Sequence, residues 1–226
     1  MAKYEIKDGV GIIPEGTTVI VDSAFNGCTE LTSIVIPDSV TSIGDNAFRN
    51  CKELKNVVIP NSVTRIGGYA FSDCESLSGV VIPNSVTSIG KCAFWGCRCL
   101  SNVVIPDSGT EIGDHTFFGC TSLTSIEIPA SVRWSFFALC ETFGCCDNLA
   151  SIVVAEGNKY YDSRGGCNAI IETKSNQLLL GCKSTIIPDT VTSIGRESFK
   201  GRIGLTSIVI PESVTEIGWG AFQECI

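Results

Sequence analysis

The amino-acid sequence repeats itself every 23 residues. The clearest markers are eight prolines, each preceded by isoleucine, and six of the seven intervals between successive prolines are 23 residues. A unit this short cannot bury its own apolar residues, so successive units must stack and share one elongated core. The repeat therefore predicts a solenoid, in which the chain of 226 residues winds through stacked coils.

The pattern within one unit predicts the local structure of a coil. Residues 31–36 alternate between apolar inward positions and outward positions, which is typical of a strand with one buried face. Pro37 ends that strand because it has no N–H for the ladder. Gly44 then permits a tight corner, and Asp45 or a neighbour is expected to cap a short helical turn through residues 48–51.

Two residue types, phenylalanine and cysteine, each recur at a fixed position of the repeat and so form a ladder along the chain. A phenylalanine recurs in the helical-turn position and is expected to form the spine of the core: Phe25, Phe48, Phe71, Phe94, Phe117, Phe143, Phe199 and Phe222. Seven of the thirteen cysteines share a second position: Cys28, Cys51, Cys74, Cys97, Cys120, Cys146 and Cys225. Stacked coils lie about 4.8 Å apart, like paired strands, and we expect buried free thiols in this ladder instead of disulfides.

The other cysteines show no paired CxxC spacing, so no zinc site is predicted. Free thiols in such number favour a reducing compartment such as the cytoplasm, although an anaerobic exterior would also keep them reduced. The first ten residues lack the apolar stretch of a secretory signal. The chain is thus either cytoplasmic or the mature form of an exported protein.

The string LTSIVIPDSVTSIGDNAFRNC, residues 31–51, resembles the repeat of the BspA-like leucine-rich repeat family, and the resemblance covers nearly the whole chain. It implies a curved, right-handed α/β-type solenoid with a parallel β-sheet on its concave side and short turns and helical turns elsewhere. It also implies a bacterial or protozoan protein, on the cell surface or secreted, that mediates adhesion or other protein contacts. The family offers no catalytic or cofactor-binding residues to carry over.

On this basis the whole chain, 1–226, is expected to form one leucine-rich repeat domain. Residues 1–11 would cap its first coil. Regular coils would occupy 12–155, with an aromatic insertion at 133–140, and 183–226, while 156–182 would form a hairpin-like insertion.

The aromatic insertion adds three residues to its coil and contains Trp134, Phe136 and Phe137. These side chains either form an exposed contact or fill the widened coil.

The second insertion adds ten residues and reads as two strands around the loop 173–176. It contains Tyr160, Tyr161 and Arg164 in a preceding loop, and it is expected to act as a lateral flap or to change the curvature. Beyond it, Arg202 takes a cysteine-ladder position, which predicts less burial there.

The outward positions of the concave strands form two stripes, which are the best candidates for a contact surface. One stripe is mostly apolar: Val35, Val58, Val81, Val104 and Glu127. The other, one residue after each proline, is acidic or amide: Asp38, Asn61, Asn84 and Asp107. An apolar band rimmed by polar groups is typical of a binding surface. Simple β-propensity, copied by repeat duplication, would also explain the valines.

The net charge of −8 argues against binding to a nucleic-acid backbone and favours a basic protein or peptide partner. No apolar run is long enough to span a membrane. The one histidine, His115, has no readable catalytic partner, and no nucleotide-binding or nucleophile motif is present. The sequence therefore predicts a non-enzymatic binding module without metal or cofactor. The alternative is a structural element that associates end to end through its uncapped C-terminal coil.

Overall fold

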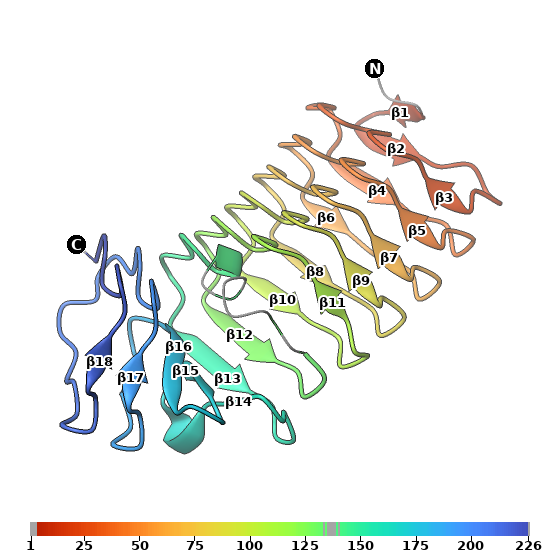
Figure 1. Cartoon of the computed structure of the whole chain (residues 1–226). Helices are drawn as coiled ribbons and strands as arrows, with labels where there is room; N and C mark the ends of the chain where they lie inside the picture. Colours follow the sequence, from red (N-terminus) through yellow and green to blue (C-terminus); the bar gives the residue numbers. More distant parts are fainter. Residues whose placement is uncertain (1–3, 133, 135–138, 140, 226) are drawn as a thin grey trace.

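The computed structural model describes residues 4–132, 134, 139 and 141–225. The chain is an elongated stack of coils, with the N-terminus at one end and the C-terminus at the other (Figure 1). Each regular coil contributes one strand to each of two parallel sheets. The two sheets lie on different sides of the coils, and the interior between them is apolar.

The first sheet is the one that the Ile-Pro strands form. Its order is β1-β2-β4-β6-β8-β10, and its members are β1 (Glu5–Lys7), β2 (Val10–Ile12), β4 (Ser33–Val35), β6 (Asn56–Val57), β8 (Gly79–Val81) and β10 (Asn102–Val104). From β2 onward the strands are parallel, and each residue pairs with the residue 23 positions later. The 23-residue period of the sequence therefore sets the register of this sheet.

The second sheet was not predicted as a separate sheet. It follows the turn after each proline, in the order β11-β9-β7-β5-β3, with β3 (Val19–Ile20), β5 (Ser42–Ile43), β7 (Arg65–Ile66), β9 (Ser88–Ile89) and β11 (Glu111–Ile112). Its strands have only two residues each, which is too few to show an alternation of inward apolar and outward polar residues in the sequence. Their inward isoleucines complete the core.

The N-terminal strand β1 pairs antiparallel with β2 and so covers the edge of the first sheet. Tyr4 beside it stacks on Phe25, with ring centroids 5.5 Å apart. This ring extends the phenylalanine ladder by one member beyond the first coil.

The phenylalanine ladder is the spine of the core, as predicted. Rings from Phe25 to Phe143 stack on one another with centroids 5.0–5.7 Å apart and planes within 13° of parallel. A second, shorter stack joins Phe199 to Phe222 at 5.1 Å. These rings are fully buried from Phe25 through Phe199, and burial of aromatic surface is the largest apolar contribution a residue can make.

The cysteine ladder is also confirmed. Each of the twelve described cysteines is a free thiol. The thiol of Cys51 donates a hydrogen bond to the carbonyl of Phe25 at 3.0 Å, and Cys74, Cys97, Cys120, Cys146 and Cys225 repeat this bond to the phenylalanine of the preceding coil at 2.9–3.3 Å. In the regular coils each of these carbonyls also accepts a backbone N–H of its own coil, such as that of Cys28 at Phe25, so the thiol is a second donor that joins one coil to the next.

The expected helical turn at residues 48–51 is wrong: residues 45–50 form a run of turns. Asn46 and Asn50 have positive φ angles of 56° and 59°, which break a helix. The backbone N–H of Phe48 instead bonds to Ala70 of the next coil. Contacts between neighbouring coils therefore replace contacts along a helix.

The glycine at the corner has a tertiary role. A Cβ on Gly44 would lie 2.7 Å from the backbone nitrogen of Asp22, so glycine is required by the close approach of the preceding coil. The cap predicted for Asp45 is wrong as well, because its carboxylate accepts the N–H of Gly68 in the next coil at 2.8 Å. Both residues hold successive coils together.

The regular pattern changes after residue 120. Strands β12 (Ser125–Ile128) and β13 (Ser151–Val154) form a parallel pair of their own. They are followed by β14 (Tyr161–Asp162), a 3-10 turn at Arg164–Gly166, β15 (Ala169–Glu172) and β16 (Gln177–Gly181).

Strands β15 and β16 form the predicted antiparallel hairpin. It is not a lateral flap, because β16 also pairs in parallel with β17 (Ser193–Ile194), which pairs with β18 (Glu216–Ile217). The hairpin lies within the stack, and its Ala169, Ile171 and Leu178 are buried.

The expectation for Arg202 is wrong: its side chain is only 2% exposed. Its Nε donates to the carbonyl of Gly181 at 2.9 Å, and its terminal nitrogens donate to the carbonyl of Phe143 at 3.3 and 3.4 Å. Because the arginine side chain is longer than a cysteine, it reaches a carbonyl that no thiol at this position could reach. The arginine that replaces the cysteine thus connects its own coil to Gly181 and Phe143 through buried hydrogen bonds.

Candidate functional site

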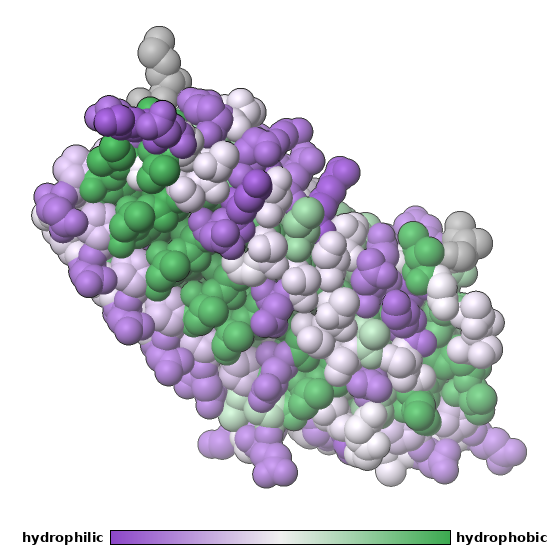
Figure 2. Space-filling model, turned by 180° about the vertical axis from the view of Figure 1, so that it is seen from behind, coloured by the Kyte–Doolittle hydropathy of each residue, from purple (hydrophilic) through white to green (hydrophobic). Residues whose placement is uncertain are grey.

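The predicted apolar stripe lies on the outer surface of the first sheet, which we call the valine face. Parallel pairing in register places its side chains in one row. Val35, Val58, Val81 and Val104 are 71, 77, 66 and 48% exposed, while the residues on either side of each in the strand are more buried. Figure 2 shows the band of apolar side chains running diagonally along the N-terminal half, with hydrophilic side chains along one side of it.

The predicted polar stripe borders this band. Asp38, Asn61, Asn84 and Asp107 are all exposed and follow the ends of successive Ile-Pro strands. The Asp107 carboxylate accepts the backbone N–H of Ser131 at 2.8 Å. Hydrogen bonds from the side chain and backbone of Ser131 hold the pKa of Asp107 below its usual value, so this carboxylate is charged at neutral pH.

Three hollows follow one another along the valine face. The first, of 350 Å³, lies between Val35 and Val58, and the second, of 610 Å³, extends from Val58 to Val104. The third, of 510 Å³, crosses β10, β12 and β13. Asp38, Asn61, Asn84 and Asp107 all line these hollows, and Asn61 lines two of them, so the two predicted stripes form one surface.

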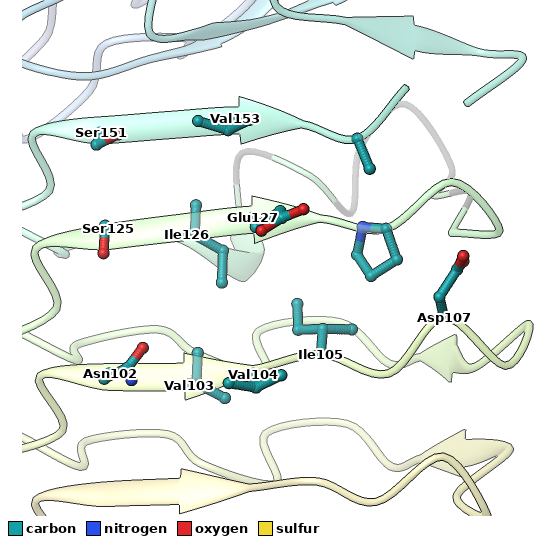
Figure 3. A pocket seen from close by; sticks show the side chains of 12 residues that line it. Asn102, Val103, Val104, Ile105, Asp107, Ser125, Ile126, Glu127, Ser151 and Val153 are labelled. Carbon is teal, nitrogen blue, oxygen red and sulfur yellow. The ribbon is translucent and has the colours of Figure 1, made fainter. Parts of the chain in front are cut away.

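Glu127 interrupts the apolar row in the third hollow. It pairs in register with Val153 on β13 and lies one coil beyond Val104 (Figure 3). Among the described residues the Glu127 carboxylate has no hydrogen-bond or ion-pair partner. The valine face thus carries one exposed carboxylate between two valines.

The aromatic candidates lie in different environments. Trp134 is buried, packs edge-on against Phe143 with ring planes 80° apart, and fills the widened coil. Tyr161 is buried too, and its hydroxyl donates to the Trp134 carbonyl at 2.9 Å and accepts the Trp134 N–H at 3.1 Å. Tyr160 is 40% exposed. Phe136 and Phe137 lie outside the described residues.

Arg164 is tied to its own segment. Its guanidinium forms a two-bond ion pair with Asp162, at 2.6 and 2.8 Å, and donates to Asn176 at 2.9 Å. The hydrogen bonds that Arg164 donates to the Asp162 carboxylate raise the pKa of Arg164, and they hold the pKa of Asp162 below its usual value against the opposing effect of burial. Together with Asn158 and Glu127, this pair lines a further hollow of 640 Å³ beside the third one.

Sequence reasoning missed Ser131, which orients Asp107. The signal was present in the repeat, since Ser39, Ser62, Ser85 and Ser108 occupy the same position. Ser39, Ser62 and Ser108 each donate to a carbonyl of the preceding coil. The Ser131 hydroxyl instead accepts the N–H of Gly109, and its backbone N–H bonds to Asp107.

Three features of the described part of the chain concern its chemistry: metal ligands, membrane-spanning helices and reactive thiols. No group of three or more His, Cys, Asp or Glu residues there is arranged to hold a metal ion. Nor is any helix in that part long and apolar enough to cross a membrane. Burial raises the pKa of the Cys51 and Cys146 thiols to about 12, so at neutral pH they are protonated and poor nucleophiles. His115 stacks on Trp95, and its Nε2 lies 3.6 Å from Oε2 of Glu141.

Comparison with known proteins agrees with this geometry. The family described as BspA type leucine rich repeat region, with six copies, matches residues 18–141, 69–165 and 169–226. The chain belongs to the BspA-type leucine-rich repeat family. A comparison with curated proteins found no match.

Solved structures of other leucine-rich repeat proteins resemble this member of the family. A leucine rich cell surface protein of Faecalibacterium prausnitzii is 31% identical over 92% of this chain and 62% of its own, with a TM-score of 0.66. The leucine rich repeat protein of T. pallidum is 33% identical over 66% of this chain and 69% of its own, with a TM-score of 0.58. The pneumococcal vaccine antigen PcpA, 24% identical over 86% of this chain and 49% of its own, shares the fold with a TM-score of 0.70. This chain thus spans less than two thirds of the Faecalibacterium protein.

Proposed function

We propose that this protein is a non-enzymatic binding module that holds a protein or peptide partner on the valine face. The observation that carries the proposal is the row of four exposed valines in successive coils of the first sheet, which lines three hollows. Leucine-rich repeat proteins in general are binding modules, and one similar structure is described as a cell surface protein. A role in adhesion is consistent with both.

The partner is expected to be basic, because the polar rim contributes Asp38 and Asp107 and the chain has a net charge of −8. Exposed charges interact over about 10 Å at 0.1 M salt, so affinity should fall as salt is added. The exposed valines would supply the apolar part of the contact, at about 25 cal/mol for each Å² of apolar surface that the partner covers.

The test uses three lysines on each of two surfaces. Val58→Lys, Val81→Lys and Val104→Lys together place charges in the apolar row, whereas Thr41→Lys, Thr64→Lys and Thr87→Lys place the same charges on exposed residues beside the second sheet. The immobilised protein is incubated with a cell extract, and bound proteins are identified by mass spectrometry. Proteins retained by the wild type and the threonine variant, but lost from the valine variant, would support the proposal. Equal retention by all three would overturn it.

Self-association is the second candidate. It is favoured by the exposed apolar residues Ile203, Val209, Ile217 and Trp219, which belong to the last coils. Sedimentation at several protein concentrations tests it: a species that grows with concentration and is lost in the variant Ile217→Lys with Trp219→Lys would support it. A monomer at every concentration would exclude it.

A further inference from the structure

From the third hollow we infer that the valine face selects a partner with a lysine or arginine side chain, which lies between Val104 and Val153 and pairs with the Glu127 carboxylate. This inference rests on the proposed function, since it concerns the same surface. The inference specifies which part of the valine face discriminates partners by charge, and which side chains of a partner bind there.

The first argument is the position of the charge. In the four preceding coils the outward residue of this row is valine, and it is valine again in the following coil, at Val153. A carboxylate between apolar side chains loses part of its hydration when a partner covers it, which costs free energy unless a cation accompanies the partner. Glu127 has no such cation of its own among the described residues.

The second argument is the shape and composition of the hollow. Its wall contains Val104, Ile105, Ile126 and Val153, and Glu127 and Asp107 are the charged residues that line it. Lysine and arginine carry a long apolar stem that packs on aliphatic side chains while the charged end reaches a carboxylate. A small inorganic cation would gain nothing from these apolar walls.

The third argument is the charge around the hollow. Asp107, held by Ser131, is a second carboxylate at the rim of the same hollow. Arg164 lines the adjoining hollow, and its charge is matched by Asp162 at 2.6 Å. The local field is therefore negative, and an acidic side chain of a partner would be repelled at this position.

The experiment uses a displayed library of random nine-residue peptides, selected on the full chain, on Glu127→Gln and on Glu127→Lys. The control Glu53→Gln removes the same charge at an exposed turn outside the hollow. Peptides from the wild type and from the control should be enriched in lysine or arginine beside apolar residues. That enrichment should be lost on Glu127→Gln and should change to aspartate or glutamate on Glu127→Lys.

Binding of one selected peptide then measures the pairing. Replacing its basic residue by norleucine, which keeps the apolar stem, should weaken binding to the wild type by about fivefold, the upper range for a partly exposed ion pair. The same replacement should leave binding to Glu127→Gln unchanged. An equal loss on both proteins would overturn the pairing.

The outcomes separate this inference from the proposed function. Suppose that peptides are selected, and that Val58→Lys and Val81→Lys weaken their binding. If these peptides show no enrichment in lysine or arginine, the inference fails and the proposed function stands. If the valine substitutions leave peptide binding unchanged, or no peptide is selected, both fail.

Discussion

In the N-terminal coils the strand pairs, ring stacks and thiol bonds recur 23 residues later, whereas residues 161–182 and Arg202 make contacts that have no counterpart in other coils. Stacked phenylalanines, thiol-to-carbonyl bonds and paired strands join each regular coil to the next. At the insertion the ring stack stops, because Gly181 takes the phenylalanine position and the Phe199 ring packs over it. The buried core divides there into two clusters.

Arg202 shows how the two clusters are joined. It makes the bond to Gly181 that a cysteine would make, and it continues to Phe143, which belongs to the first cluster. A regular coil thus depends on many equivalent contacts, and the junction depends on a few specific ones. Removing one contact should therefore have different consequences in the two regions.

The largest effect is expected in the regular region. Phe71→Ala removes a fully buried ring stacked on both sides, and the free energy of unfolding should fall by about 3–5 kcal/mol. Phe222→Ala, in the short second stack, removes a half-buried ring and should cost clearly less. Urea denaturation of both variants measures the difference. Equal losses would show that ring burial does not distinguish the two stacks.

An intermediate effect is expected at the junction. Arg202→Ala leaves the carbonyls of Gly181 and Phe143 without their donor, and each buried unsatisfied group costs about 1–3 kcal/mol. Because the loss is local, hydrogen exchange should accelerate in residues 183–225 and remain slow in residues 20–120. The control Arg196→Ala removes an exposed guanidinium. Uniform acceleration along the chain would contradict the division into two clusters.

The smallest expected effect is the change that one buried thiol makes to stability between pH 8 and pH 10. The folded protein raises the pKa of Cys51 and Cys146 from 9.0 to about 12, so each thiol stabilises the fold below pH 9 and loses this contribution as pH rises to about 12. Within that range stability should fall by about 1.4 kcal/mol per pH unit for each such cysteine. Cys51→Ala should make the decline shallower by that amount, and Cys99→Ala, at an exposed thiol, should not. Urea denaturation at pH 8 and pH 10 gives the comparison, and identical slopes would contradict the buried thiol ladder.

Much of the fold follows from the repeat because its contacts are between identical positions. The period of 23 residues predicts the stack, the first sheet, the phenylalanine spine and the thiol ladder, all of which the structure contains. The helical turn was wrong because bonds between coils at Phe48 outweigh the local preference of one isolated turn. Asp45 was misassigned for the same reason.

The candidate surface also contains some features that the sequence predicts and others that it does not. Alternation in the strands was enough to place Val35, Val58, Val81 and Val104 outward, since strand geometry allows only two faces. Burial of Trp134 and Tyr161, and the bonds of Arg164 to Asp162 and Asn176, depend on how the two insertions pack. Their sequences contain no period from which that packing could be inferred.

The sequence by itself determined the architecture of this protein, the inward and outward positions of its regular coils, and its membership of a repeat family. Only the tertiary structure decided that the second insertion enters the stack, that Arg202 is buried, and that Glu127 lies in a hollow between valines with no cation from the described residues. The physical reason is that a repeated contact joins equivalent positions of neighbouring repeat units, so the sequence shows it once in each unit. A unique contact joins residues that no sequence pattern relates. Arg202 and Phe143 are 59 residues apart in the sequence, and their hydrogen bond crosses a coil in which Gly181 makes room for the Phe199 ring.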